Sequence, residues 1–343
     1  MTINIQDSHT LAGVVEKLQP INSFWLNLVF PTVQTFEDEF IDFDIVDKGR
    51  RVAPFVAPNV AGKPMTSKGF ATRRFKPAYV KPKHAVEPNR VLKRRAGEAY
   101  TGSMSPEQRE RAIITDILRE QREMIERRWD IMAASAVIDG SVTIAGDDYP
   151  EVTISFGRAA GNTVTLGNGE RWGDSGIKPL DQIQTWADTV YANSGYAPTD
   201  IIMGAAAWAA FRVDPDVQKQ LEMRRGSVQS ELNLAPEVLA PVAYKGQVGA
   251  FRVWVYKDWY ENNSGTNVEI MNSKAVVLLN PQAIEGVRAF GAIMDARAGF
   301  QAMPIFSKMW LNEDPSVTYL MSQSAPLMIP TRPNAVLKAT VLA

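Results

Sequence analysis

The longest regular pattern of apolar and polar residues runs from residue 106 to residue 139. Apolar side chains recur there every three or four positions, as on the buried face of an α-helix. The preceding Ser105-Pro106-Glu107-Gln108 combines a capping serine, a proline at the first helical position and a glutamine that completes a capping box. Asp139-Gly140 supplies a stop. The pattern therefore predicts a helix on the order of 50 Å long.

The opposite side of this predicted helix is charged. Charges of both signs alternate along it, which indicates a solvated face with supporting ion pairs. The residues concerned are Arg119, Glu120, Arg122, Glu123, Glu126, Arg127 and Arg128.

Shorter patterns follow toward the C-terminus and indicate both helices and strands. Alternating runs at 141–144, 151–156 and 162–166 predict a small meander of hairpins. Residues 179–192 and 205–223 have helical periodicity, and Asp214-Pro215 should interrupt the second helix. Residues 224–233 have the composition of an exposed loop. The remaining predicted strands cover residues 199–203, 248–256, 275–279, 316–320 and 335–342. The mixture predicts an α+β protein.

The first 48 residues have the composition of an arm. An apolar cluster around Phe24, Trp25 and Phe30 is followed by an acidic run that begins at Glu37 and ends at Asp47. So short a segment cannot build a core of its own. Its aromatic side chains therefore either dock on another surface or pack on the chain's own domain, and the sequence leaves both open.

Residues 50 to 95 have the opposite charge. Thirteen lysines and arginines face one acid, Glu87, and six prolines interrupt the segment. Such proline spacing excludes a helix and favours an extended, two-stranded loop. The aromatic side chains of Phe55, Phe70 and Phe75 argue against simple disorder. We expect the segment to obtain its hydrophobic contacts from a neighbouring copy of the chain.

An acidic arm and a basic loop on one chain can pair within a subunit or between subunits. Because the loop has little core of its own, the sequence favours pairing between subunits, which generates rings or closed shells. The residues expected at such interfaces are Phe24, Trp25, Glu37, Asp38, Glu39, Phe55, Lys68, Phe70, Arg73, Arg74, Phe75, Lys76, Lys81, Lys83, Arg94 and Arg95.

Composition excludes several other functions. Lysine plus arginine number 37 against 38 aspartates plus glutamates, so the chain lacks the strong positive charge of a nucleic-acid coat. There is no cysteine to form a disulfide or ligate zinc, and no apolar run is long enough to cross a membrane. A signal peptide is not expected at the N-terminus. We therefore expect no metal and no cofactor.

Candidate catalytic residues are few. His9 and His84 are the two histidines, and the cations beside His84 would oppose its protonation as a general base. No motif of a nucleophile elbow, a phosphate-binding loop or a zinc protease is present. We predict that the protein is not an enzyme. Two alternatives remain: a hydrolase using Asp147, Asp148 and His84, and a nucleic-acid-binding module using the basic segment.

Five short motifs occur along the chain in a fixed order. They are Tyr79-Val80-Lys81-Pro82-Lys83-His84, Val91-Leu92-Lys93-Arg94-Arg95, Arg224-Arg225-Gly226-Ser227, Tyr244-Lys245-Gly246 and Gln323-Ser324-Ala325-Pro326-Leu327-Met328. In this order they resemble the lambda-like major capsid proteins, the phage capsid protein E family, and the resemblance extends over nearly the whole chain.

The resemblance implies the tailed-phage major capsid fold of the Hong Kong ninety-seven type. It implies an N-terminal arm (1–48), an extended basic loop (49–100), a peripheral domain (101–203) with a spine helix at 106–139, and an axial domain (204–265). Residues 266–343 would return to the peripheral sheet and supply a C-terminal strand.

The same resemblance implies a structural role. The subunits would form hexamers and pentamers of an icosahedral phage head, assembled in the host cytoplasm around a scaffold and filled with double-stranded DNA, held by weak, non-specific contacts. Because only about 48 residues precede the basic loop, we expect the scaffold to be a separate protein. A portal protein and, as in some relatives, a decoration protein would be further partners. A cellular nanocompartment that encloses cargo is the alternative with the same fold.

Overall fold

The computed structural model describes residues 8–18, 21, 23–45, 55, 58, 61, 71–93, 104–146, 149–223, 241–262, 264–314 and 316–343. Its α-helices are α1 (Ser8–Lys17), α2 (Phe24–Val29), α3 (Pro88–Leu92), α4 (Pro106–Ile138), α5 (Pro179–Ser194), α6 (Ala205–Val213), α7 (Pro215–Met223) and α8 (Pro281–Ile284). Its strands are β1 (Thr32–Thr35), β2 (Ile41–Ile45), β3 (Ala71–Phe75), β4 (Lys83–Val86), β5 (Ser141–Gly146), β6 (Tyr149–Ser155), β7 (Thr163–Thr165), β8 (Asp200–Gly204), β9 (Val242–Val248), β10 (Phe251–Tyr256), β11 (Trp259–Glu261), β12 (Asn267–Glu269), β13 (Ala275–Leu279), β14 (Gly286–Phe290), β15 (Phe306–Asn312), β16 (Val317–Gln323), β17 (Pro326–Pro330) and β18 (Val336–Thr340).

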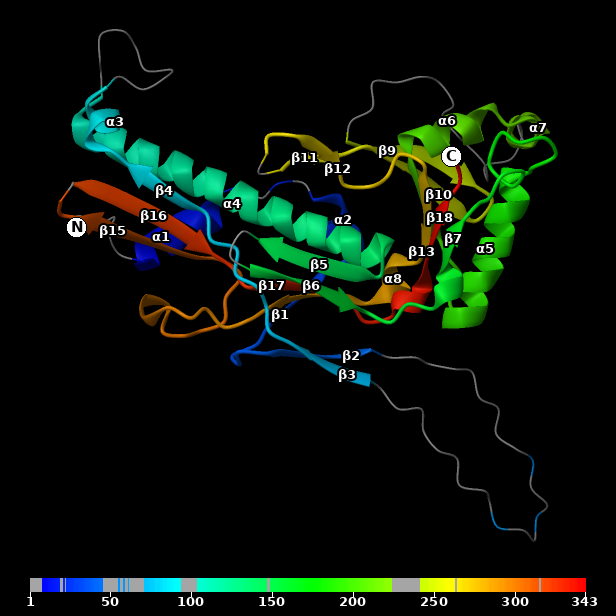
Figure 1. The fold of residues 1–343 in the computed structure, drawn as a ribbon, viewed down its shortest axis with the longest axis horizontal. Helices are drawn as coiled ribbons and strands as arrows, with labels where there is room; N and C mark the ends of the chain where they lie inside the picture. The colour runs from blue at the N-terminus through cyan, green and yellow to red at the C-terminus, as the bar shows by residue number, and fades with distance from the viewer. Residues whose placement is uncertain are drawn as a thin grey trace.

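Helix α4 crosses the molecule and organises one half of it (Figure 1). The predicted capping box is confirmed: Ser105 Oγ accepts from Gln108 N at 3.2 Å, and Gln108 Oε1 accepts from Ser105 N at 3.0 Å. The first part of α4 packs on the sheet β15-β16-β4 and on α1, through Ile113, Ile117 and their neighbours. Its second part packs on the sheet β1-β14-β17 and the hairpin β5–β6.

A six-stranded sheet organises the other half, in the order β7-β18-β13-β8-β10-β9. Side chains alternate between its two faces. One face contacts α5 and α6 through residues such as Ile201 and Val276, and the other contacts α2 and the end of α4 through residues such as Ile202 and Val277. Both faces are covered, which is why its central strands are continuously apolar in sequence.

Most helix and strand predictions are confirmed. The exclusion of any helix from residues 50–95 is wrong, because Pro88 occupies the first turn of the short helix α3, where a proline is tolerated. Helices α5, α6 and α7 and strands β8, β13, β16 and β18 lie where the sequence placed them, and the break at Asp214-Pro215 separates α6 from α7. The predicted meander is wrong, because β7 pairs parallel with β18 instead of continuing the β5–β6 hairpin. The strand expected at 248–256 is confirmed as β10, which starts at Phe251. Its first residues instead end β9 and turn at Gly249, whose φ is +59°, so that β9 and β10 form an antiparallel hairpin.

The six-stranded sheet mixes chain segments that the sequence assigned to different domains. Its strands β7 and β8, β9 and β10, and β13 and β18 come from the expected ranges 101–203, 204–265 and 266–343 respectively. The C-terminal strand β18 lies second in this sheet, between β7 and β13, and not in the smaller sheets beside α4. Pairing between strands so distant in sequence leaves no local signal.

Candidate assembly surface

The base of the basic loop is a hairpin formed by β2 and β3. In its antiparallel register Asp42 lies opposite Arg74 and Phe43 opposite Arg73. Ile41 and Phe43 are buried, and the ring of Phe43 lies 5.9 Å from that of Phe156 in the core. Alternation therefore presents Asp42 and Arg74 on the exposed side of the hairpin.

The acids of the arm and the cations of the loop pair within this hairpin. Arg74 binds Asp42 through two hydrogen bonds of 2.8 Å, and this hydrogen bonding lowers the pKa of Asp42. Lys76 pairs with Glu39, and Arg73 donates to the carbonyl oxygen of Ser155. For these residues the sequence-based preference for pairing between subunits is wrong, because strand register places opposite charges side by side on one chain.

The remaining interface candidates near the hairpin differ in exposure. Glu37 and Asp38 are exposed, and Phe75 is half-buried against the core. Phe55 is fully exposed, with 104% of its reference surface accessible. Lys68, Phe70, Arg94 and Arg95 lie outside the described residues. Phe55 is therefore a large apolar residue of the described loop whose ring has no contact in its own subunit.

Residues 80 to 86, by contrast, do find contacts on their own chain. Strand β4 pairs antiparallel with β16, and Val86 is buried. The Lys83 ammonium lies 4.1 Å from the ring centroid of Tyr319, and that of Lys81 lies 4.7 Å from the ring of Tyr79. The expectation that the whole segment 50–95 lacks contacts on its own chain is wrong for this part, because β16 provides a strand edge.

The N-terminal arm also packs on its own subunit, which is the second of the two alternatives left open by the sequence. Trp25, Leu26, Val29 and Phe30 are each at most 3% exposed and join the core formed by α4 and the sheets. Phe24 lies 5.7 Å from the ring of Trp254. Trp25 is thus inaccessible to a neighbouring copy in this structure, contrary to its selection as an interface residue.

Three charged residues of α4, at successive intervals of four, hold the arm by its backbone. Arg122 donates to the carbonyls of Val15 and, at 2.7 Å, Leu18, and it also binds Glu126 at 2.7 Å. Glu126 accepts from Ile21 N at 2.8 Å, and Asp130 accepts from Leu26 N at 3.2 Å in the first turn of α2. We call Arg122, Glu126 and Asp130 the charged stripe.

The charged stripe was missed by sequence reasoning. Arg122 and Glu126 were assigned to a solvated face, yet their side chains are only 15% and 8% exposed, because the arm covers them. The interval of four along one helix face was visible in the sequence. Without knowledge that the arm lies there, this interval is equally typical of exposed ion pairs.

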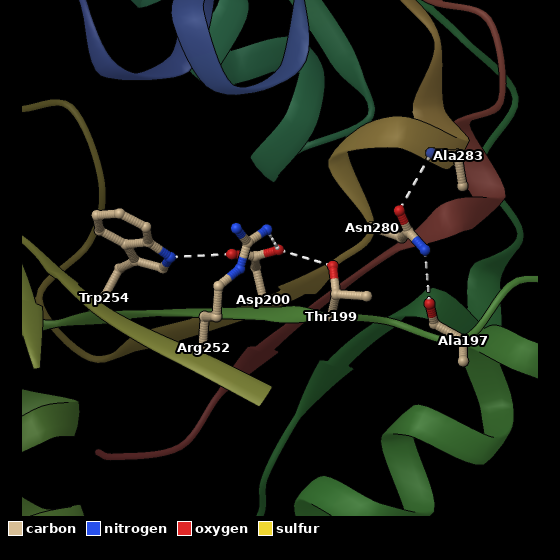
Figure 2. Close-up of polar contacts among 7 residues, drawn as sticks. All are labelled: Ala197, Thr199, Asp200, Arg252, Trp254, Asn280 and Ala283. Carbon is tan, nitrogen blue, oxygen red and sulfur yellow. Dashed lines mark hydrogen bonds and ion pairs between the residues drawn. The ribbon is translucent and has the colours of Figure 1, made fainter. Parts of the chain in front are cut away.

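A buried carboxylate supports the aromatic residue against which the arm packs (Figure 2). Asp200 is fully buried at the start of β8. Its Oδ2 accepts from Arg252 Nη2 and from Thr199 Oγ1, each at 2.7 Å, and its Oδ1 accepts from Trp254 Nε1 at 2.9 Å. Trp254 contacts Phe24, so this network fixes the ring that receives the arm. Beside it, Asn280 caps α8 at Ala283 N and donates to Ala197 O.

Asp130 predicts a measurable pH dependence of stability. Burial raises its pKa to about 6, against 3.8 in the unfolded chain, with Asp258 nearby and Arg288 opposing the shift. Between these values the folded chain binds a proton that the unfolded chain lacks, so stability rises as pH falls from 7 toward 4. Asp130→Asn should therefore raise the free energy of unfolding at pH 7.5 by about 1–3 kcal/mol.

Denaturant melts of the unassembled variant and parent, at pH 7.5 and 4.5, measure this effect. The gain should fall to about 1 kcal/mol at the lower pH, where the folded parent is already protonated but the unfolded chain is still mostly ionised. Asp116→Asn is the control: its side chain on the same helix is 40% exposed and pairs with Arg119, and the variant should show no such pH dependence. An Asp130→Asn variant that is equally destabilised at both pH values would contradict the raised pKa of Asp130 in the folded chain.

The residues considered for catalysis have structural contacts or lie outside the described chain. His84 Nδ1 lies 3.0 Å from Gln121 Nε2, and Gln121 also bonds the Leu320 carbonyl and Ser322 in a buried network. Asp147 and Asp148 are outside the described residues. In the described part of the chain, no three His, Cys, Asp or Glu side chains are grouped to hold a metal. No described helix is long and apolar enough to span a membrane.

Comparisons of sequence identify one family, and comparisons of structure identify related folds. Residues 7–341 match the family model for phage major capsid protein E. The chain is 33% identical over 332 residues to the major capsid protein of Escherichia phage lambda, covering 94% of this chain and 95% of the relative. The structure of a prophage capsid protein from E. coli CFT073 superposes with a TM-score of 0.73 at 23% identity, covering 98% and 99% of the two chains. The mature capsid of bacteriophage PhiM1 gives a TM-score of 0.52 at 11% identity, covering 94% and 88%.

Proposed function

Because this chain belongs to the phage major capsid protein E family, we propose that it closes its shell by laying the segment between β2 and β3 over a neighbouring copy. Its role is that of a structural protein of a tailed-phage head, with an icosahedral shell as its assembled form. The relatives build phage heads, which favours this role over the cellular nanocompartment that the sequence left open.

The observation that carries the proposal is the contrast between Phe55 and the hairpin below it. Register, ion pairs and the buried side chains of Ile41 and Phe43 anchor β2 and β3 to their own subunit. Phe55, between these strands in sequence, is fully exposed. A large apolar surface without a contact in an otherwise anchored hairpin favours a contact on another molecule. In a shell, that molecule is another copy.

The proposed division of labour departs in part from the expected ranges. The segment between β2 and β3 reaches the neighbour and the arm supports the spine helix α4. The axial position is taken by the six-stranded sheet with α5 to α7, which draws strands from the expected ranges 101–203, 204–265 and 266–343 and not from 204–265 alone. Hexamers and pentamers arise because the same contact repeats around closed symmetry. Many individually modest contacts then resist opening together.

The proposed partners come from the family and from the charge of the chain. A separate scaffold guides assembly in the host cytoplasm, and a portal protein is a further partner. A decoration protein, present in some relatives, is an additional candidate. Packaged double-stranded DNA is held by weak contacts, because a net charge of −1 provides little attraction for phosphates. The subunit carries out no catalysis of its own.

Electron microscopy of the expressed protein, with and without the scaffold protein of the same phage, tests this function. We expect closed, uniform shells with the scaffold and fewer or irregular shells without it. A protein that stays monomeric at every concentration and in both conditions would overturn the proposal.

A further inference from the structure

A pocket of about 350 Å³ opens between helix α4, the hairpin β5–β6 and the chain that follows β3. Ile131 and Met132 line it from α4, and Val142 and Ile144 line it from β5. A cavity of about 150 Å³ with similar apolar walls is large enough for benzene. This pocket, which we call the α4 pocket, therefore has the size and the lining to receive an aromatic side chain.

The α4 pocket differs in charge from two further pockets in the described part of the chain. Glu126 and Arg288 line one of those, and Asp214 and Asp216 line the other. Among the described residues that line the α4 pocket, Arg128 is the charged one, and its side chain is exposed. Of the three pockets, the α4 pocket is thus the one that an uncharged ring can fill without covering half-buried charged groups.

The chain carries an exposed side chain of the matching kind. Phe55 has 104% of its reference surface accessible. Its phenyl ring and the walls of the α4 pocket both leave apolar surface in contact with water. That surface is removed from water when the ring fills the pocket, which is favourable in proportion to the area buried.

Phe55 does not fill the pocket of its own subunit. Strand β3 runs from Ala71 to Phe75, and the chain reaches the α4 pocket after it, at residues 78–80. The loop that carries Phe55 leaves the hairpin at the opposite end, where Ile45 pairs with Ala71. The full exposure of the phenyl ring agrees with this separation. A ring that enters the pocket has to come from another copy.

The acids next to the pocket in sequence suit a basic loop. Asp147-Asp148 lies outside the described residues, between Gly146 and Tyr149, which both line the α4 pocket. These two acids outnumber the single cation, Arg128. In the loop, Arg50-Arg51 precedes the phenyl ring by four to five residues. Opposite charges on the two surfaces favour their approach and fix the orientation in which they meet.

We infer that Phe55 of one copy enters the α4 pocket of the adjacent copy. This inference rests on the proposed function, which brings the copies together. The phenyl ring and the pocket are different surfaces, so the contact is head to tail: each copy inserts one side chain and receives one. Repeated contacts of this kind close into a ring of copies, the arrangement that a hexamer or pentamer requires.

Disulfide trapping tests the contact, because the chain contains no cysteine of its own. Phe55→Cys is combined with Ala145→Cys in one chain, since Ala145 lines the pocket and is exposed. A disulfide requires Cα atoms within about 7 Å of each other. After assembly with the scaffold and oxidation, non-reducing electrophoresis should show a ladder of linked copies beyond the dimer, whereas each single variant should stop at the dimer. Phe55→Cys with Thr185→Cys, an exposed position on α5, is the control pair and should give no ladder.

These results distinguish the inference from the proposed function. If the parent forms no shells, the proposed function fails. If the double variant forms shells but its linked products stop at the dimer, the loop meets its neighbour elsewhere, so the inference is wrong and the proposed function stands. A ladder of equal intensity from the control pair would also overturn the inference.

A pocket-filling variant keeps the test decisive if the cysteine variants do not assemble. Ala145→Trp places a ring in the pocket from the receiving copy and should reduce closed shells by about tenfold or more. Adding Phe55→Ala should restore shells in part, because the incoming ring is then absent. Ala145→Ser is the matched control and should assemble like the parent. Particle counts measure these results, and melting curves of the free subunits check folding. Shells of normal number from a folded Ala145→Trp variant would exclude the α4 pocket as the receiving site.

Discussion

Replacing Phe55 with aspartate should abolish closed shells while the subunit keeps its fold. The side chain is fully exposed, so its replacement removes no described contact within the subunit. Exposed substitutions of this kind change stability by about 0.5 kcal/mol or less. In the proposed contact with a neighbour, however, each copy would bury an unpaired carboxylate, which costs several kcal/mol per site. Repetition around the shell multiplies that cost.

Negative-stain microscopy and sedimentation of Phe55→Asp, expressed with the scaffold, measure the effect. Phe55→Leu is the matched control: it preserves an apolar side chain of similar reach, and shells should still form. If Phe55→Asp gives shells of normal number and stability, the loop does not use this residue to reach its neighbour.

Replacing Trp25 with alanine should destabilise the subunit by about 3–5 kcal/mol, the usual range when a buried tryptophan is truncated. Trp25 is fully buried, and its ring lies 5.4 Å from that of Tyr256 and 5.4 Å from that of Phe24. Removal of the ring leaves a cavity between α2, α4 and the six-stranded sheet. The arm should consequently leave the charged stripe at lower denaturant concentration.

Denaturant unfolding of the unassembled subunit, together with proteolysis of the arm, measures this loss. Trp259→Ala is the matched control, because Trp259 on β11 is 53% exposed and its removal should cost little. If Trp25→Ala lowers the free energy of unfolding as little as Trp259→Ala does, the arm does not depend on Trp25 for its docking.

The spine helix α4 and helices α5, α6 and α7 were predictable because their signals are local, whereas α1, α2, α3 and α8 were not predicted. The capping box at Ser105 and the break at Asp214-Pro215 depend on residues within one turn of each other. Such signals do not depend on what packs against the helix. The apolar strands β8 and β13 were predictable for a similar reason, since burial on both faces gives an uninterrupted apolar run.

Strand pairing was not predictable to the same degree. β7 and β18 are adjacent in the sheet, but their paired residues, such as Thr163 and Lys338, are 175 positions apart in sequence, and no local pattern reports their parallel register. The short exposed strand β1 lies beside β14 for the same non-local reason. Its residues are all exposed, so it lacks the apolar alternation by which strands are recognised.

For the candidate surface, composition identified the segment but not its partners. The exposure of Phe55 agrees with an aromatic side chain placed among prolines and cations. The pairing of Arg74 with Asp42 depends on register between β2 and β3, which the sequence of either strand alone does not determine. The opposite charges of the arm and the loop predict that the two segments attract each other. They do not determine whether each segment pairs with its own chain or with a neighbouring copy.

The charged stripe has an evolutionary consequence. Arg122, Glu126 and Asp130 bind main-chain N–H and C=O groups, which nearly every amino acid supplies. Substitutions at Leu18 or Ile21 that retain the backbone path leave these bonds unchanged. The backbone path of the N-terminal segment can therefore be retained during evolution while its side chains change. Such substitutions leave its hydrogen bonds to the charged stripe intact.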